Sequence, residues 1–160
     1  MPRKFRRSLS LALILGFAPG GALTILAAPL PAPLAQVAAQ DSLYKRLGGY
    51  DALAAVTDDF ISRLVTDPKL GRFFVGLSTD SKIRIRQHVV DFLCVATGGP
   101  CKYTGRDMVT AHTGLNITDD DWTISVKHLG ATLDKFKVPA REQQEVVSAI
   151  APLKSQIVGK

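Results

Sequence analysis

Several residue patterns that mark enzymes and metal-binding proteins are missing from this sequence. Its 160 residues include two cysteines and three histidines, and their spacing gathers no set of three or four ligands such as a zinc ion needs. We find no glycine pattern of a phosphate-binding loop, no pair of inward carboxylates and no nucleophile placed beside a base. The sequence therefore argues against a zinc enzyme, a phosphate-loop protein and a covalent hydrolase.

Strand-forming patterns are also scarce. Alternating Val/Ile-rich runs do not occur, and no repeat appears after Ala39. Apolar residues recur at intervals of three and four instead, which predicts an all-α fold. We expect Asp51 and Thr118 to cap helices and Pro152 to kink or shorten the last one. The predicted helices are Ser42–Leu47, one carrying Leu53 to Leu64, one over about Ser81–Thr97, a short one over Arg106–Leu115, one carrying Trp122 to Phe136, and one opened by Val138–Pro139.

Acidic residues are absent from the segment 1–39, which holds four of the 20 basic residues. The formal charge of the whole chain is +6, but the remainder sets 16 basic residues against 14 acidic ones and carries only +2. Such a small excess of positive charge gives no support to nucleic-acid binding. We therefore expect no nucleic-acid partner.

The same N-terminal segment has the layout of a secretory signal. Four basic residues precede an apolar tract from Leu9 to Leu30, and Val37–Ala39 supplies small or apolar residues near a cleavage site. We predict a leader over 1–39, one folded domain over 40–160, and a periplasmic or extracellular location. The alternative is an uncleaved anchor, because a bilayer span needs only about 20 apolar residues. Any membrane contact would then be made through the leader.

The stretch Gly98–Leu115 places a histidine on an apolar helical face. Met108, Ala111, His112 and Leu115 follow one another at i, i+3, i+4 and i+7. One interpretation is a core histidine bonded to a backbone carbonyl. The other is an axial metal ligand that faces a flat apolar cofactor. A second histidine, His88, lies earlier in the chain on a predicted face with Ile85, Val89 and Phe92, whereas His128 is expected at the surface.

Three segments carry a family resemblance: LYKRLGG (43–49), DDFISRLVTDPKLGRFF (58–74) and GGPCKYTGRDMVTAH (98–112). In order and separation they resemble the truncated haemoglobins, most closely group 1, over about residues 42–158. The resemblance implies a two-over-two helical fold enclosing haem b. Two histidines on separate helices also suit haem iron better than zinc. Since no Cys-x-x-Cys-His motif occurs, c-type attachment is not indicated.

The resemblance also implies roles for individual residues. His112 matches the proximal histidine that ligates the iron, and Phe74 matches the phenylalanine on the haem face, with Phe60 behind it. Arg84 is a candidate partner for a haem propionate, because it lies about one turn before His88. The positions matched to the haem edge on the proximal side are Tyr103, Arg106 and Met108.

The distal positions depart from the family pattern. Ile61 stands where group 1 members commonly have a tyrosine, Val89 where a glutamine is frequent, and Ile85 fills another distal position. The polar cage that holds bound oxygen is therefore mostly missing. His88 matches a position from which some relatives supply an internal sixth ligand, so it either binds the iron or donates a hydrogen bond to a bound ligand.

The function implied is an exported haem protein that binds O₂, NO or CO and is not primarily an enzyme. One alternative is a bis-histidine electron-transfer protein with a redox partner. Another is a haem-dependent oxidoreductase acting on NO or peroxide. The two cysteines, Cys94 and Cys101, flank a Gly-Gly-Pro turn and are expected to form a disulfide in an exported protein, the alternative being two free thiols.

Overall fold

The computed structural model describes residues 41–160, and every regular element within them is helical. The all-α prediction is therefore confirmed, while the predicted leader at 1–39 lies outside the described residues. None of the helices in the described range is long and apolar enough to cross a membrane. The elements are α1 Leu43–Arg46, α2 Gly49–Thr66, η1 Gly71–Phe74, α3 Thr79–Ala96, α4 Met108–His112, α5 Asp119–Lys135, α6 Ala140–Ile150, η2 Ala151–Leu153 and α7 Lys154–Ile157.

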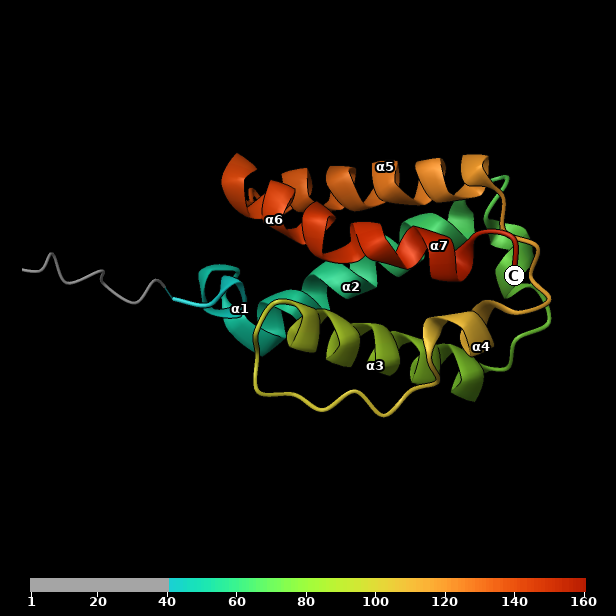
Figure 1. Cartoon of the computed structure of the whole chain (residues 1–160), viewed down its shortest axis with the longest axis horizontal. Helices are drawn as coiled ribbons and strands as arrows, with labels where there is room; N and C mark the ends of the chain where they lie inside the picture. Colours follow the sequence, from blue (N-terminus) through green and yellow to red (C-terminus); the bar gives the residue numbers. More distant parts are fainter. Residues whose placement is uncertain (1–40) are drawn as a thin grey trace, which may run out of the picture. The chain divides into compact units, whose positions relative to one another are not determined.

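The longer helices form two pairs, α2 with α3 and α5 with α6 (Figure 1). Helix α2 also contacts α5, and the short α4 packs against α7 near the end of the chain. A long connection leaves the end of α3 and returns along that helix before α4 begins (Figure 1). This connection and α4 carry the stretch that the sequence marked as functional.

Helix α2 joins two clusters of buried apolar side chains. Its Val56 packs with Leu129 and Leu133 of α5 and with α6, whereas its Leu53 packs with α3. Fully burying side chains of this size contributes about 1.5–3 kcal/mol each. The core therefore lies along α2. Because α3 packs one of its faces against α2, its other face, away from α2, is left for other contacts.

Two predicted helix boundaries are confirmed and one is wrong. Thr118 and Asp121 form a reciprocal capping box at the start of α5, and Pro152 converts the end of α6 into the 3₁₀ turn η2. Asp51 does not cap α2. The cap residue is Gly48, at φ 96°, a left-handed conformation that glycine adopts without strain, and Asp51 lies in the first turn.

His128 is half-buried and paired, so its predicted surface position is wrong. Its Nε2 lies 2.8 Å from Oδ2 of Asp67, which joins α5 to the turn after α2. The other carboxylate oxygen of Asp67 accepts hydrogen bonds from the backbone N–H groups of Lys69 and Leu70. The bond from His128, together with these two, lowers the pKa of Asp67 to about 2.

We expect the stabilising effect of Asp67 to depend on pH. Its folded-state pKa lies below the value of about 3.9 for an unfolded chain, so the carboxylate stabilises the fold above pH ~4, and this contribution is lost as the pH falls towards about 2. The Asp67→Asn variant should therefore unfold at lower urea concentration than the wild type near neutral pH, and the two midpoints should converge on acidification. A difference that stays constant with pH would contradict this.

Candidate functional site

Helix α4 is shorter than predicted and ends at His112. Asp107 caps it by accepting a hydrogen bond from the backbone N–H of Thr110 at 2.9 Å, and the side-chain hydroxyl of Thr110 is the main cause of a lowered pKa for that carboxyl. The helix stops before Leu115, which is 40% exposed. The predicted apolar face through Leu115 is therefore wrong, because the chain leaves the helix directly after the histidine.

The His112 imidazole has a defined tautomer. Its Nδ1 lies 2.7 Å from the backbone carbonyl oxygen of Met108, one turn earlier in α4. A carbonyl oxygen only accepts, so Nδ1 must carry the hydrogen and donate it. In the neutral ring the lone pair then lies on the other nitrogen, Nε2. This arrangement is typical of histidines that ligate metals, whose second nitrogen is held by a backbone or carboxylate acceptor.

His88 presents the opposite situation, a buried nitrogen with no partner. It lies on α3 among the half-buried side chains Ile85 and Val89, and its Nδ1 makes no hydrogen bond within residues 41–160. Leaving a buried polar atom unsatisfied costs about 1–3 kcal/mol. Thr57 Oγ1 is the other such atom in the described part of the chain.

Tyr103 brings the connection before α4 against α3. Its ring meets the His88 ring edge-on at a centroid distance of 6.0 Å and the Phe92 ring at 5.6 Å. The phenol donates a hydrogen bond to the Arg106 carbonyl at 2.7 Å. Burial, and to a lesser degree the Asp107 charge, raises the pKa of the Tyr103 phenol, which keeps it a donor. One side chain thus touches the His88 face and the segment that leads to His112.

Two glycines make this packing possible, and sequence reasoning assigned them only to breaks between helices. A Cβ added at Gly105 would lie 2.5 Å from Cζ of Tyr103, so the ring folds back over a residue that must lack a side chain. At Gly99 a Cβ would meet Cys94 Sγ and Tyr44 Cδ2, each at 2.6 Å. The spacing Tyr-x-Gly was the signal that would have revealed the first contact.

The structure places the other predicted residues on η1, α2, α3 and the connection before α4. Phe74 ends η1 and is half-buried, and Phe60 packs against the core between α2 and α5. Arg84 is exposed and donates to Ser81 Oγ at 3.2 Å. Neither it nor the exposed Arg106 forms an ion pair with a carboxylate of residues 41–160. No hydrogen bond or ring contact joins His88 to His112 in that range, so the two imidazoles remain on separate elements.

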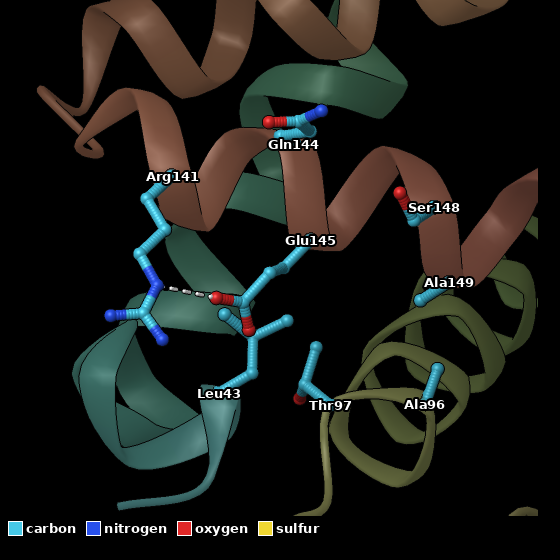
Figure 2. A pocket seen from close by; sticks show the side chains of 8 residues that line it. All are labelled: Leu43, Ala96, Thr97, Arg141, Gln144, Glu145, Ser148 and Ala149. Atoms are coloured by element: carbon cyan, nitrogen blue, oxygen red, sulfur yellow. Dashed lines mark hydrogen bonds and ion pairs between the residues drawn. The ribbon is translucent and has the colours of Figure 1, made fainter. Parts of the chain in front are cut away.

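An open hollow elsewhere contains none of these residues. It lies between α1, α6 and the end of α3, with a volume of about 580 Å³, and an Arg141–Glu145 ion pair spans part of its wall (Figure 2). Its lining offers no histidine or cysteine. The lining residues are Leu43, Ala96, Thr97, Arg141, Gln144, Glu145, Ser148 and Ala149.

The predicted site fits haem on its own chemistry. Within residues 41–160 it offers Nε2 of His112, a buried Nδ1 of His88 without a hydrogen-bond partner, and the exposed guanidinium groups of Arg84 and Arg106 for carboxylates. No cluster of three or more His, Cys, Asp or Glu among residues 41–160 could hold a bare metal ion instead. Apolar residues are usually fully buried, but five of those predicted to line the haem are half-buried: Phe60, Phe74, Ile85, Val89 and Phe92.

Known proteins give the same assignment. The model of the bacterial-like globin family matches residues 42–158. The group 1 truncated hemoglobin GlbN of Mycolicibacterium paratuberculosis is 36% identical over 116 residues, covering 72% of this chain and 83% of that protein. GlbN of Nostoc commune is 33% identical over 74% of this chain and 98% of its own length.

Solved structures are similar over the same region. The truncated hemoglobin of Tetrahymena pyriformis in its Fe(III) form superposes with a TM-score of 0.69 at 28% identity, covering 75% of this chain and all of that one. A 2/2 hemoglobin from Synechococcus, solved in the cyanomet state with covalently attached heme, gives 0.68 at 27% identity and the same coverage. The two helix pairs are therefore the two-over-two globin arrangement, and the chain belongs to the group 1 truncated haemoglobins of the bacterial-like globin family, whose cofactor is haem iron.

Proposed function

We propose that this chain is an exported globin that binds a small diatomic ligand, O₂, NO or CO, at a haem iron ligated by His112. Haem, when bound, supplies an iron with one axial position for a protein nitrogen and one for a ligand. The observation that carries the proposal is the 2.7 Å hydrogen bond from His112 Nδ1 to the Met108 carbonyl, which leaves Nε2 free. It also orients the ring, because the acceptor belongs to the same helical turn.

The distal side is proposed to be apolar, with His88 as its polar group. Ile61, Ile85 and Val89 provide no hydrogen-bond donor from their side chains, so a ligand that needs a polar cage is held weakly. This proposal is supported by the buried Nδ1 of His88, which makes no hydrogen bond within residues 41–160. His88 is thus available either to occupy the sixth coordination position or to donate to the bound ligand.

Electron transfer is the second candidate, and the same histidine favours it. Coordination of both axial positions by imidazoles would leave no site for a gas without prior release of His88. Such a protein would exchange electrons with a redox partner, and the exposed Arg84 and Arg106 would be candidate contacts for that partner. Rapid ligand binding by the reduced protein would count against this alternative.

Export is proposed from the leader at 1–39 and agrees with the bond between Cys94 and Cys101, seven residues apart, in the structure. Disulfides persist in oxidising compartments and are rare in cytosolic proteins.

We expect native protein to keep both cysteines unmodified when alkylated before reduction and to gain two adducts when alkylated after it. Intact-mass spectrometry measures this directly, with the Cys94→Ser/Cys101→Ser protein as the zero-adduct control. Two adducts before reduction would contradict both the disulfide and its use as support for export.

Absorption spectra of the purified ferric and ferrous protein test the proposed function. We expect a haem spectrum, ligand-dependent shifts on adding CO, and a six-coordinate ferrous form without added ligand. A protein that takes up no haem would overturn the proposal. A five-coordinate ferrous form would retain gas binding and remove the internal ligand.

A further inference from the structure

Three features restrain the Tyr103 ring in its contact with His88. The His88 and Phe92 rings meet the Tyr103 ring edge-on, its hydroxyl is bonded to the Arg106 carbonyl at 2.7 Å, and Gly105 leaves room beneath it. Edge-to-face packing is a preferred aromatic geometry and restricts rotation of both rings. Within residues 41–160, His88 has no hydrogen bond at Nδ1 that would fix its ring instead.

The disulfide fixes the position from which Tyr103 reaches α3. Cys94 is fully buried on α3, and Cys101, two residues before Tyr103, is bonded to it. The intervening Gly99 packs against Cys94, and its backbone N–H donates to the Cys94 carbonyl at 2.7 Å. The start of the connection is therefore attached to the same helix that carries His88.

We propose that Tyr103 is a positioning residue for His88, and that the Cys94–Cys101 disulfide holds it in place, so that the thiol–disulfide state of this pair adjusts the distal side. The inference rests on the proposed role of His88 in the haem pocket. With the bond intact, the Tyr103 ring limits the rotamers of the imidazole, which lowers the entropy lost when His88 coordinates or donates. Without it, the connection loses its covalent attachment and the ring contact weakens.

The redox step needs a dithiol reductant. One thiolate attacks the half-buried Cys101 sulfur, the Cys94 thiolate leaves, and the second thiol of the reductant resolves the mixed disulfide. Two electrons pass to the protein, Cys94 and Cys101 each end with one proton, and the reductant becomes a disulfide. The haem iron takes no part in this exchange.

The first test is structural and does not require His88 to coordinate the iron. In the diamagnetic ferrous CO form, or in the purified protein as it stands if no haem is bound, proton NMR should show a nuclear Overhauser effect between the Tyr103 and His88 rings. It should persist in Tyr103→Phe at the ring positions, and be lost after dithiol reduction and in Gly105→Ala, whose new methyl occupies the space of the ring. A contact that is absent in the wild type or survives reduction overturns the proposal.

The second test measures the consequence for His88. Tyr103→Leu, Gly105→Ala and reduction of the wild type should each lower the six-coordinate equilibrium constant of the ferrous protein about threefold to tenfold, the range expected for one aromatic contact. Tyr103→Phe keeps the ring contact and loses only the hydroxyl bond to Arg106, so its constant should fall less than that of Tyr103→Leu. Reduction should change nothing further in Tyr103→Leu and nothing in the Cys94→Ser/Cys101→Ser protein. The proposal is overturned if reduction lowers the constant of Tyr103→Leu as much as that of the wild type. It is also overturned if Tyr103→Leu has the same six-coordinate equilibrium constant as the wild type, or a larger one.

Failure of this inference and failure of the proposed function are separable. Absence of haem uptake, or a five-coordinate wild type, counts against the proposed function or its internal ligand, while the ring contact and its loss on reduction still decide the positioning role. Conversely, the wild type can be six-coordinate with a spectrum that changes neither on reduction nor in Tyr103→Leu. That result keeps the proposed function and contradicts the positioning of His88 by Tyr103 and the disulfide.

Discussion

His112→Ala should lose stable haem binding while keeping most of its helix content. The substitution removes the proposed axial ligand, whereas α4 makes few contacts with the core formed by α2, α3, α5 and α6. Changing a residue that merely orients a metal ligand typically costs about ten- to a hundredfold in affinity. We therefore expect loss of the ligand itself to lower haem affinity by more than about a hundredfold, measured by transfer of haem to an acceptor globin.

The matched control is His128→Ala. His128 is also half-buried, but it lies on α5 and its ring nitrogen is bonded to Asp67 in the turn after α2. This variant should be less stable than the wild type and should bind haem with an unchanged spectrum. A normal spectrum and normal affinity in His112→Ala would refute the assignment. Addition of imidazole offers a further check, because it should restore a haem spectrum only in the His112 variant.

The helices could be predicted because their signals are local. Apolar spacing placed α3 and α5 close to their observed bounds, and the capping box at Thr118 needs only positions i and i+3 of the chain. The start of α2 could not be placed in this way. Asp51 is a good capping residue by type, but Gly48, in a left-handed conformation, already turns the chain into the helix.

The site could be predicted in its residues but not in their contacts. The motif around His112 identified the histidine, and a bond to a backbone carbonyl was one of its two interpretations. The acceptor, Met108, and the end of α4 at His112 were not predicted, because the apolar pattern extended the helix too far. The contact of Tyr103 with His88 joins α3 to a later position across a non-helical connection. Periodicity carries no information about such a connection, whereas the lack of a side chain at Gly105 reports on it through close packing.

His128 illustrates the same limit. It lies beside the apolar stripe of α5, and its sequence neighbours gave no sign of a partner. The partner is Asp67, 61 residues away in the turn after α2, and the pair forms only because α2 and α5 pack together. Long-range polar pairs of this kind are fixed by tertiary packing, which a single sequence does not display.

His88→Leu should convert the ferrous protein from six- to five-coordinate and accelerate CO binding. While His88 occupies the sixth position, only the open fraction of molecules binds the gas, and the observed rate falls in proportion to that fraction. If His88 is bound in about 90–99% of molecules, its removal raises the CO association rate about tenfold to a hundredfold. Leucine fills the pocket with an apolar side chain and adds no competing ligand.

Gln87→Leu is the matched control for this prediction, since it also replaces a polar side chain by leucine, one residue earlier on α3. The Gln87 amide is bonded to the Tyr50 hydroxyl and the Asp91 carboxylate at 2.8 and 2.9 Å, on a side of α3 that faces α2. It should leave coordination and CO kinetics as in the wild type. Flash photolysis and rapid mixing distinguish the outcomes. Identical CO rates in the wild type and His88→Leu, together with a five-coordinate wild-type spectrum, would show that His88 does not bind the iron. His88 would then be a residue of the pocket wall, and its side chain would at most donate a hydrogen bond to the bound ligand.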